Sequence, residues 1–351
     1  MKGIILHGGY GTRLGPLTFS GPKQLIPIAN KPMSQYALED LLTAGISEIA
    51  IIIGDVFPQR VKNYYGDGSK FGAKITYIFQ DKPKGISHAI GLCKNFIGDD
   101  KFVVYLGDNI LRKGLGNLTK KFIESKNEFM ILLSEVDDPS RFGIAEFDNE
   151  TISKIIEKPK ITSSNLAVIG IYFLNPKIFP IIEKLKPSQR GELEITDALD
   201  ESLKNKISIS YEKVTGWWKD TGTAEDILDA NRLILETLGT SNELIKSKIV
   251  NSEKILLGKN CIVSSDTKII PPVIIGDNCK IESAQIGPNV SVGNNSKISH
   301  STIMNSIIME NCNISISKVI SSSIISNYSE IISSNSDSQT YLIGEKSKIQ
   351  L

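Results

Sequence analysis

The chain has 351 residues and carries 40 basic and 39 acidic side chains, which leaves a formal net charge of +1. This length predicts about two domains with an ample hydrophobic core. The balanced charge excludes a protein-wide positive field that would recruit nucleic acid or an anionic membrane, so small-molecule partners are expected instead.

The cysteines and the amino terminus bear on the cellular compartment. The four cysteines are scattered along the chain and form no C-x-x-C pair, which argues against a disulfide framework and against a zinc site. Only a brief apolar run precedes His7, too short for the hydrophobic region of a signal peptide, and no run approaches membrane-spanning length. We therefore expect a cytoplasmic protein without a membrane span.

The first predicted element is a short buried strand that ends in a glycine-rich loop. The apolar run Ile4–Leu6 stops abruptly before Gly8–Gly11, which indicates a sharp turn at the carboxyl end of the strand. Open α/β sheets bind ligands at this edge. Glycines there let backbone N–H groups approach oxyanions, and Arg13 and Lys23 add positive charge. The stretch predicts a polyphosphate site.

Two common glycine motifs do not fit this loop. The dinucleotide-binding fingerprint requires a third glycine at position 14, where Leu14 stands, and the ATPase loop ends in lysine followed by serine or threonine. Neither motif is present. For the loop taken alone, an ordinary glycine turn with solvated basic residues is the alternative.

Helices and strands then alternate. Apolar residues at helical spacing predict a helix from Met33 to Ala44 that ends at Gly45, and the uninterrupted apolar run Ile49–Ile53 predicts a strand of a sheet covered on both faces. The next expected elements are a helix at 57–65, a strand at 75–79, a helix that begins at 85–89 and a strand at 102–106. This order predicts a doubly wound α/β layer.

Strands dominate the next part of the chain. They are expected at 130–136, 143–147, 152–156 and 168–174, with few helices between them. An amphipathic helix is expected at Asp226–Leu238, and Gly239–Asn242 is typical of a linker. We predict an α/β domain over residues 1–238 and a linker over 239–250.

Beyond the linker the sequence becomes rich in Ile, Ser and Asn. Apolar positions recur every six residues, and the phase slips between successive sets. The sets are Ile275 and Ile281; Ile286, Val292, Ile298 and Met304; Ile308, Ile314 and Ile320; and Ile325 and Ile331. Hexapeptide periodicity is typical of a parallel β-helix, in which each coil buries a ladder of aliphatic side chains. We predict such a domain over residues 251–351.

Ordered motifs in the first two thirds of the chain carry a family resemblance. They are GGYGTRLGPLT and GPKQLIPIANKP, followed by Tyr105–Asn109, Ile156–Pro159, Arg190–Asp197 and Trp218–Thr223. Together they resemble the sugar-1-phosphate nucleotidylyltransferases, most of all the long form of glucose-1-phosphate thymidylyltransferase. The resemblance implies a Rossmann-like, mixed-sheet nucleotidyltransferase domain. Similarity of the repeats to hexapeptide proteins implies a left-handed parallel β-helix and a homo-oligomer.

The resemblance assigns the nucleotide to the glycine loop and the neighbouring strand ends. The implied nucleotide-binding residues are Leu6, Gly8, Gly9, Gly11, Thr12, Arg13, Lys23, Gln24, Gln80, Gly85 and Asp108. In the family, glutamines that match Gln24 and Gln80 hydrogen-bond the pyrimidine edge, and a side-chain amide offers the donor and the acceptor that suit an imide. The glycine that matches Gly85 lets the base lie close to the backbone. Without the resemblance, the two glutamines would be read as surface residues.

The resemblance assigns the sugar phosphate to a second set of residues. The implied residues are Asn109, Gly143, Glu157, Lys158 and Gly170. A carboxylate accepts hydrogen bonds from sugar hydroxyls, and a lysine beside it can hold the phosphate; the alternative is a solvated charge pair ahead of a proline turn. The stretch Arg190–Asp197 leads into a helix with a carboxylate-rich first turn. Because helix capping competes with ligand contact there, we place none of its residues in the catalytic set.

The implied reaction is attack by the phosphate of glucose 1-phosphate on the α-phosphorus of dTTP, with release of pyrophosphate. Its nucleophile is already ionised, so cations are needed more than a general base. The predicted catalytic residues are Arg13, Lys23, Asp108, Lys158 and Asp220. Of these, Asp108 and Asp220 are the expected Mg²⁺ ligands, because Mg²⁺ prefers oxygen donors. Taken alone, a strand-end aspartate is more often a cap.

Several alternatives stay open. UTP could replace dTTP, with a glucose or amino-sugar 1-phosphate as acceptor, because thymine and uracil differ by one methyl group. A non-catalytic sugar-nucleotide sensor or assembly subunit could share both folds. The repeat domain could be a scaffold, an effector site or an acyltransferase; we favour a scaffold, because its one histidine, His300, is more often structural or solvated in such repeats.

Two positions depart from the commonest family pattern. His7 replaces a small residue ahead of the glycine pair, and it could narrow the nucleotide pocket or contact the base. Gly15 stands where arginine is frequent, which removes a possible phosphate contact or salt bridge. Neither change removes a residue of the predicted catalytic set.

Overall fold

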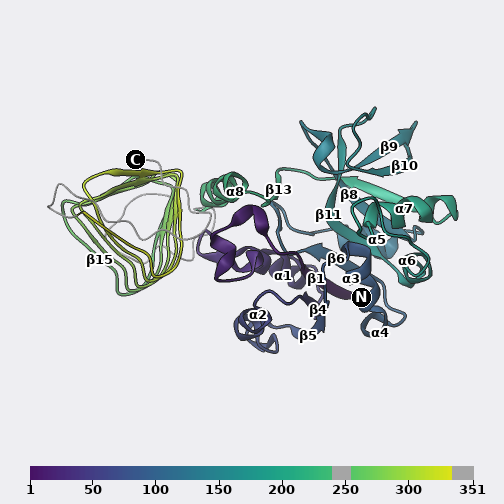
Figure 1. Ribbon diagram of the computed structural model, residues 1–351, viewed down its shortest axis with the longest axis horizontal. Coiled ribbons are helices and arrows are strands. Elements are labelled where there is room, and N and C mark those ends of the chain that lie inside the picture. Colours follow the sequence, from purple (N-terminus) through teal and green to yellow (C-terminus); the bar gives the residue numbers. More distant parts are fainter. Residues whose placement is uncertain (239–253, 334–351) are drawn as a thin grey trace. The chain divides into compact units, whose positions relative to one another are not determined.

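The structure is a computed structural model that describes residues 1–238 and 254–333. Figure 1 shows the ribbon. Two compact units share the chain: the first comprises Met1–Tyr10, Gly21–Leu25 and Met33–Asp220, and the second comprises Gly11–Ser20, Ile26–Pro32 and Thr221–Leu351. The predicted linker at 239–250 lies outside the described residues.

The first unit is built on a mixed sheet, as predicted, which has nine strands in the described residues. Its main path runs β10-β9-β11-β6-β1-β4-β5, and β8 pairs with β11 and β12. The parallel strands are β1 (Lys2–His7), β4 (Glu48–Ile53), β5 (Lys74–Phe79) and β6 (Phe102–Leu106). The remaining strands are β8 (Phe129–Glu135), β9 (Gly143–Asp148), β10 (Thr151–Glu157), β11 (Leu166–Leu174) and β12 (Ile209–Lys213).

Both faces of this sheet are covered. Along β4, Ala50 and Ile52 join one hydrophobic cluster while Ile49, Ile51 and Ile53 join the other, because successive side chains point to opposite faces. One face packs against α3 (Ile86–Leu92), α6 (Phe179–Ile182) and α7 (Ile195–Lys204). The other packs against α1 (Met33–Thr43), α2 (Pro58–Tyr65) and α5 (Leu118–Glu124). The continuous apolar runs of the sequence thus correspond to doubly covered strands.

Helix α1 ends as its sequence predicts. Gly45 adopts a left-handed φ of 81°, the Gly45 N–H donates to the Leu42 carbonyl, and the Ile46 N–H donates to the Leu41 carbonyl. These bonds satisfy carbonyl groups that a helix end leaves without partners. A short helix, α4 (Lys94–Ile97), follows α3 and leads toward β6.

The second unit contains a parallel β-helix, which confirms the prediction from the hexapeptide pattern. Three ladders of short parallel strands form its walls (Figure 1). The first consists of β14 (Ile255–Leu257), β17 (Val273–Ile275), β20 (Val290–Val292), β23 (Ile307–Ile308) and β26 (Ile324–Ile325). The second consists of β15 (Ile262–Val263), β18 (Lys280–Glu282), β21 (Lys297–Ser299), β24 (Asn313–Ser315) and β27 (Glu330–Ile332). The third consists of β16 (Lys268–Ile269), β19 (Gln285–Ile286), β22 (Thr302–Met304) and β25 (Val319–Ser321).

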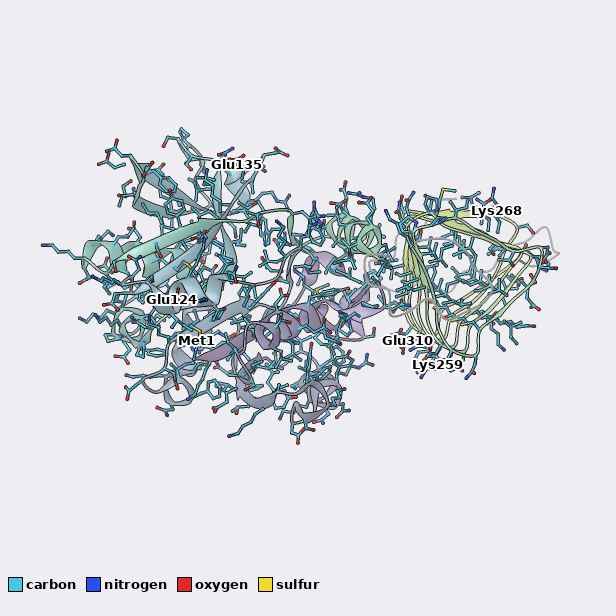
Figure 2. All side chains as sticks on the ribbon, turned by 180° about the vertical axis from the view of Figure 1, so that it is seen from behind. Met1, Glu124, Glu135, Lys259, Lys268 and Glu310 are labelled. Atoms are coloured by element: carbon cyan, nitrogen blue, oxygen red, sulfur yellow. The ribbon has the colours of Figure 1, made fainter. Side chains whose placement is uncertain are left out.

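The buried residues inside the β-helix correct one position of the predicted six-residue pattern. Val292 and Ile298 are buried as expected, but Ile303 then enters the core and Met304 does not. The chain passes this corner in five residues instead of six, with His300 at a φ of 51° in the turn. Each five-residue corner shifts the apolar phase by one position, which is the physical reason for the slip in the sequence pattern. In Figure 2, Lys259, Lys268 and Glu310 point outward from the coils.

Asparagines form another corner of the β-helix. Asn260, Asn278, Asn295 and Asn311 all adopt left-handed backbone conformations, with φ between 56° and 59°. The Asn260 Nδ2 donates to Asn278 Oδ1 at 3.1 Å, and the Asn278 Nδ2 donates to Asn295 Oδ1 at 3.2 Å. Asparagine tolerates this backbone region better than other residues with a Cβ atom, which accounts for its abundance here.

Segments from distant parts of the chain complete the second unit. They include a hairpin of β2 (Pro27–Ile28) and β3 (Lys31–Pro32) and the helix α8 (Ala224–Thr237), whose first turn has a Thr223/Asp226 capping box. Asn231 of α8 is buried, and its Oδ1 accepts hydrogen bonds from the Ala29 N–H at 2.8 Å and the Ser291 hydroxyl at 3.0 Å. Hairpin, helix and β-helix therefore meet at one amide. No helix in the described ranges is long and apolar enough to cross a membrane.

Candidate functional site

The glycine loop begins where β1 ends, at one edge of the large sheet. Leu6 is in register with Ile52 of β4 and Leu106 of β6, so these parallel strands end at the same edge. A Cβ atom on Gly8 would lie 3.4 Å from Gln80 Oε1, and Gly9 has a φ of 94° that favours glycine. A side chain at position 8 would thus contact Gln80, and Gly9 is exposed.

The two glutamines that resemblance assigns to the base converge on Gly8. The Gln24 Nε2 donates to the Gly8 carbonyl at 3.0 Å, and Gln80 follows β5 with its N–H bonded to the Ile53 carbonyl at 2.9 Å. Both side chains are nearly inaccessible, at 2% and 4% exposure. Within the described parts of the chain, Gln24 Oε1 has no hydrogen-bond partner. A buried acceptor without a partner costs free energy that a bound donor would recover.

Position 85 requires a glycine because the backbone of Leu193 passes close to it. Its φ is 101°, and a Cβ atom there would lie 2.4 Å from the Leu193 carbonyl oxygen. The next helix, α3, is then held by the Ser87 N–H, which donates to the same carbonyl at 3.1 Å. The glycine allows this close approach, which fixes the start of α3 beside Gln80.

A charged cluster lies at the end of β6. The Lys23 Nζ contacts Asp108 Oδ2 at 2.7 Å, and the Asn109 Nδ2 donates to Asp108 Oδ1 at 2.9 Å. Burial by itself would raise the pKa of Asp108, but the Lys23 ammonium and these hydrogen bonds outweigh it and lower the pKa below the usual value. Asp108 is therefore an anion at neutral pH, and Lys23 is its paired cation.

Asp220 returns to this cluster in a two-stranded antiparallel pair whose strands are far apart in sequence. Strand β7 (Asn109–Leu111) pairs antiparallel with β13 (Trp218–Asp220), and the register sets Asp220 opposite Asn109. Directly opposed residues in such a pair have Cα atoms about 4.5–5.5 Å apart. The Trp218 Nε1 donates to Asn109 Oδ1 at 2.7 Å and fixes that amide. The pairing thus sets the backbone of Asp220 opposite the residue that follows Asp108 in the chain.

The donor chemistry of this pair fits a magnesium ion. Asp108 and Asp220 offer carboxylate oxygens, and among the described residues no group of three or more His, Cys, Asp or Glu side chains is arranged as a metal site. A site with two protein carboxylates leaves the other positions to water and phosphate oxygens, which is how Mg²⁺ is commonly held. The pair suits an ion shared with a phosphorylated substrate.

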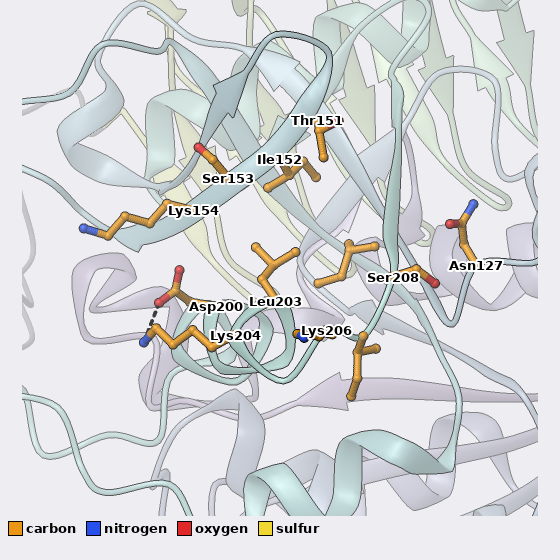
Figure 3. A pocket seen from close by; sticks show the side chains of 12 residues that line it. Asn127, Thr151, Ile152, Ser153, Lys154, Asp200, Leu203, Lys204, Lys206 and Ser208 are labelled. Carbon is orange, nitrogen blue, oxygen red and sulfur yellow. Dashed lines mark ion pairs between the residues drawn. The ribbon is translucent and has the colours of Figure 1, made fainter.

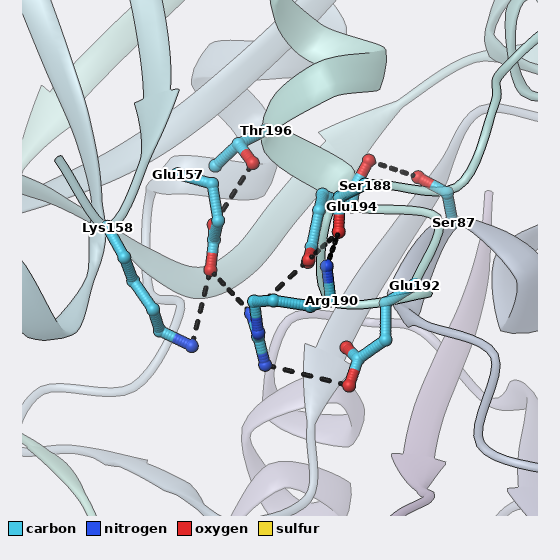
Figure 4. A network of polar contacts seen from close by, with 8 residues as sticks. All are labelled: Ser87, Glu157, Lys158, Ser188, Arg190, Glu192, Glu194 and Thr196. Carbon is cyan, nitrogen blue, oxygen red and sulfur yellow. Dashed lines mark hydrogen bonds and ion pairs between the residues drawn. The ribbon is translucent and has the colours of Figure 1, made fainter.

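Glu157 is the centre of a second polar network (Figure 4). Its Oε1 lies 3.3 Å from Lys158 Nζ and 3.2 Å from Arg190 Nη1, while its Oε2 accepts a hydrogen bond from the Thr196 hydroxyl at 3.0 Å. Gly143 makes room for this arrangement, because a Cβ atom there would lie 2.4 Å from Thr196 Cγ2. Lys158 has a left-handed φ of 42°, uncommon for a residue with a side chain.

Sequence patterns alone do not predict that Arg190 and Thr196 join this network, since helix capping competes with ligand contact as an explanation for their stretch. The structure excludes the side chain of Glu194 as a cap of α7, since that side chain makes no capping hydrogen bond. Glu194 instead lies 3.3 Å from Arg190 and accepts a hydrogen bond from Ser188 at 2.9 Å. Burial raises its pKa, partly opposed by Ser188. The signal available in the sequence is a basic residue, Arg190, four positions before the acidic Glu194.

Gly170 is explained by its contact with Asn109. A Cβ atom on Gly170 would lie 2.9 Å from the Asn109 side-chain amide carbon and 2.7 Å from Leu106. The absence of a side chain at 170 therefore lets Asn109 occupy its place between Asp108 and Trp218. This role is steric, and it links the middle of β11 to the aspartate cluster.

Gly11, Thr12 and Arg13 belong to the second unit. Gly11 has a φ of 60°, its carbonyl accepts a hydrogen bond from the Thr18 hydroxyl at 3.1 Å, and a short 3₁₀ helix spans Thr12–Leu14. The guanidinium of Arg13 packs against Gly222, where a Cβ atom would lie 3.2 Å from Arg13 Nη2. Gly222, from the sixth family motif, thus leaves room for Arg13.

His7 is buried next to the aspartate cluster. Neither ring nitrogen has a hydrogen-bond partner among the residues that the structure describes, and its ring meets Tyr65 edge-on with centroids 5.8 Å apart. Burial lowers the pKa of His7 to about 3, although the nearby Asp108 carboxylate acts in the opposite direction. His7 is therefore a neutral imidazole at physiological pH.

A cavity of about 610 Å³ lies elsewhere in the first unit (Figure 3). Its lining includes Lys154, Leu203 and Lys206, and Lys204 forms an ion pair with Asp200 at 2.9 Å. None of the site residues predicted from the sequence lines it. The polar cluster at the sheet edge is therefore the better candidate for the chemistry.

Two family models match the chain. Residues 2–237 match the nucleotidyl transferase family, and residues 269–350 match the GMPPB C-terminal domain. A low-salt glycan biosynthesis nucleotidyltransferase of Haloferax volcanii is 42% identical, with full coverage of both chains. A glucose-1-phosphate thymidylyltransferase of Streptomyces antibioticus is 37% identical over all of this chain and 99% of its own.

Solved structures agree with these matches. A Bacillus anthracis structure described as a glucose-1-phosphate thymidylyltransferase has a TM-score of 0.63 and 44% identity, and the match covers 66% of this chain and 94% of that one. A UDP-glucose pyrophosphorylase complexed with UDP-glucose has a TM-score of 0.60 and 30% identity, over 67% and 98%. The resemblance carried by the sequence motifs is thereby confirmed, and the chain belongs to the nucleotidyl transferase family.

Proposed function

We propose that the protein transfers a thymidylyl group from dTTP to glucose 1-phosphate, giving dTDP-glucose and pyrophosphate. The observation that carries the proposal is the cluster of Lys23, Asp108 and Asn109, with Asp220 opposite Asn109 in the β7–β13 pair. In the proposal, the lysine of this cluster binds phosphate and the two aspartates supply oxygen ligands at the sheet edge where the glycine loop begins. Full-length relatives named as glucose-1-phosphate thymidylyltransferases support the same substrates.

The residues divide between the two substrates. Lys23 and Arg13 are assigned to the triphosphate, and Lys158 is assigned to the phosphate of the sugar. The phosphate oxygen of glucose 1-phosphate forms a bond with the α-phosphorus, and the bond from that phosphorus to the bridging oxygen of pyrophosphate breaks. Because the nucleophile is an anion, the residues act by holding two repelling substrates together and not by removing a proton.

Asp108 and Asp220 are proposed to hold Mg²⁺, which when bound would neutralise charge on the phosphate oxygens. The lowered pKa of Asp108 keeps it ionised for this role, and Lys23 is released from the ion pair to a phosphate when the nucleotide enters. Glu157 is assigned to the sugar hydroxyls, since Arg190 and Thr196 fix its carboxylate.

The second candidate substrate is UTP, because uracil presents the same imide edge to Gln24 and Gln80. The similarity to a UDP-glucose pyrophosphorylase supports this reading. The test is pyrophosphate release with dTTP, UTP, CTP, ATP and GTP against a panel of sugar 1-phosphates that includes glucose and amino sugars. We expect the highest kcat/KM for dTTP with glucose 1-phosphate. Absence of release with every pair, from a folded protein with Mg²⁺ present, would support the sensor instead.

A further inference from the structure

Gln80 has a neighbour on α3 that the proposed function does not yet use. His88 lies in the first turn of that helix, and its Nδ1 is 2.8 Å from Gln80 Nε2. The same Nε2 lies 3.4 Å from the Gly85 carbonyl oxygen. The amide of Gln80 is therefore held between a histidine ring and a backbone carbonyl, both contributed by the start of α3.

The chemistry of these partners decides which way the amide points. A backbone carbonyl can only accept a hydrogen bond, so the NH₂ group of Gln80 must face Gly85. The second hydrogen of that NH₂ then points to His88 Nδ1, which must carry a lone pair. This arrangement requires a neutral imidazole with its proton on Nε2. The contact to His88 is the shorter of the two, so His88 contributes most to fixing the amide.

The opposite end of the amide faces the ligand side of the loop. Gln80 Oε1 is the atom that a Cβ on Gly8 would meet at 3.4 Å. Gln24 contacts the same loop through its Nε2, which donates to the Gly8 carbonyl, and its Oε1 is left without a partner among the described residues. Gln80 thus places its amide oxygen, and not its NH₂ group, beside Gly8.

We propose that His88 is a positioning residue which, as a neutral acceptor, turns the Gln80 carbonyl oxygen toward the nucleotide and so selects a base that carries a ring N–H. This inference rests on the proposed function and deepens it. Thymine and uracil have an N–H at ring position 3, which can donate to Gln80 Oε1. Cytosine has a lone pair at that position and would face an oxygen, which leaves two acceptors opposed.

The charged groups around His88 favour the neutral ring. Partial burial lowers its pKa below 6.5 and the nearby Lys84 lowers it further, whereas Asp81 acts in the opposite direction. Lys84 and Asp81 pair with each other at 3.1 Å, which reduces the effect of each on the ring. His88 therefore accepts from Gln80 at neutral pH and becomes a donor only in acid.

Protonation has a definite consequence for base selection. An imidazolium carries an N–H at Nδ1, which cannot accept from Gln80, so the amide would rotate and present its oxygen to His88. Its NH₂ group would then face the nucleotide. An NH₂ group suits the ring nitrogen of cytosine and not the N–H of uracil, so acid should weaken the preference for UTP over CTP.

The experiment measures equilibrium dissociation constants of UTP and CTP, which differ only at the base, at pH 8 and pH 5.5. Wild type is compared with His88→Asn, whose side-chain oxygen supplies an acceptor that does not titrate, and with His88→Leu, which has no acceptor. The control is His300→Asn, at an exposed β-helix corner whose left-handed backbone suits asparagine.

We expect the UTP preference of wild type at pH 8 to fall about tenfold in His88→Leu, the size expected for one hydrogen bond. His88→Asn should keep the preference at both pH values, whereas wild type and His300→Asn should lose part of it at pH 5.5. Titration of the nucleotides themselves is common to all variants and cancels in the comparison.

Two results would overturn the inference while leaving the proposed function intact. One is an unchanged UTP preference in His88→Leu at pH 8, and the other is the same loss of preference at pH 5.5 in His88→Asn as in wild type. Failure of every variant and of wild type to bind any pyrimidine nucleotide would overturn the proposed function and this inference together.

Discussion

In the β-helix, buried polar side chains have partners that repeat from coil to coil, whereas at the end of β1 they do not. Cys279 donates to the Gly293 carbonyl at 3.2 Å and Ser296 donates to the Met309 carbonyl at 3.1 Å. Within coils 254–333, no buried polar side-chain atom lacks a hydrogen bond. His7 and Gln24, by contrast, carry buried polar atoms without partners.

At the end of β1 we connect this difference with ligand binding, although Thr119 and Asn231 elsewhere in the described residues also carry a buried polar atom without a partner. A buried polar atom without a partner costs about 1–3 kcal/mol, so a fold retains one where something else supplies the hydrogen bond or where function requires it. Substitutions at the sheet edge should therefore change activity more than stability. Substitutions inside the β-helix should do the reverse.

The largest effect on activity is expected for Asp220→Asn. Removal of one of the two proposed Mg²⁺ ligands should lower the rate of pyrophosphate release by at least about 100-fold, while the melting temperature stays within a few degrees. The matched control is Asp137→Asn, an exposed carboxylate in the same unit. Wild-type turnover of Asp220→Asn at saturating Mg²⁺ would remove the basis for the metal role.

Lys158→Ala should affect one substrate and not the other. Loss of the proposed contact to the sugar's phosphate should raise the KM for glucose 1-phosphate about tenfold or more and leave the KM for dTTP nearly unchanged. Lys160→Ala, two residues on and exposed, controls for a general loss of positive charge. Equal changes in both KM values would contradict the assignment.

Measurements of the free energy of unfolding can test whether Ile303, and not Met304, belongs to the core of the β-helix. Ile303→Ala should lower the free energy of unfolding by about 2–4 kcal/mol, because Ile303 is fully buried, and Met304→Ala should cost clearly less. Unfolding followed by circular dichroism in denaturant compares the two, and the kcat of the folded enzyme should change little in either. A larger cost at Met304 would restore the uninterrupted six-residue pattern.

The last prediction concerns the effect of acid on His7. The pKa of His7 is about 3 in the folded chain and 6.5 in the unfolded one, so between these values only the unfolded chain binds the proton. Stability should therefore be complete above pH 6.5 and decrease as the pH falls toward 3, by up to about 1.4 kcal/mol per pH unit from this group. In His7→Leu this part of the slope should vanish in denaturant titrations at pH 7, 6 and 5. An identical slope in both proteins would mean that His7 is charged or exposed when folded.

The sequence was sufficient for elements whose determinants are local. The C-cap at Gly45 follows from one glycine after an apolar helix, and β4 follows from its continuous run of aliphatic residues. The position of Asp220 opposite Asn109 depends on pairing between segments more than 100 residues apart, which neither segment encodes alone. Family resemblance assigned Asp108 and Asp220 a common role, and the register of β7 and β13 shows how the two segments meet.

Two details depend on tertiary structure that the sequence pattern does not specify. For the stretch around Arg190, helix capping and ligand contact compete as explanations in the sequence, and in the structure tertiary contacts bring Arg190 and Thr196 to Glu157. The shift from Met304 to Ile303 arises because a corner of the coil is one residue shorter than the repeat. Both details depend on where the chain turns, and the spacing of apolar residues in the sequence does not specify the turns.

The chain passes between its two compact units several times before it enters the β-helix, first at Tyr10 and last at Asp220. Asn231 joins the hairpin around Ala29 to Ser291 through a single buried amide. The repeat domain consequently cannot be separated from the rest of the protein by one cut in the chain, because its compact unit includes Gly11–Ser20 and Ile26–Pro32. An engineer who shortened the protein at any one peptide bond, or exchanged its coils for those of another family, would also have to redesign the hairpin at residues 26–32.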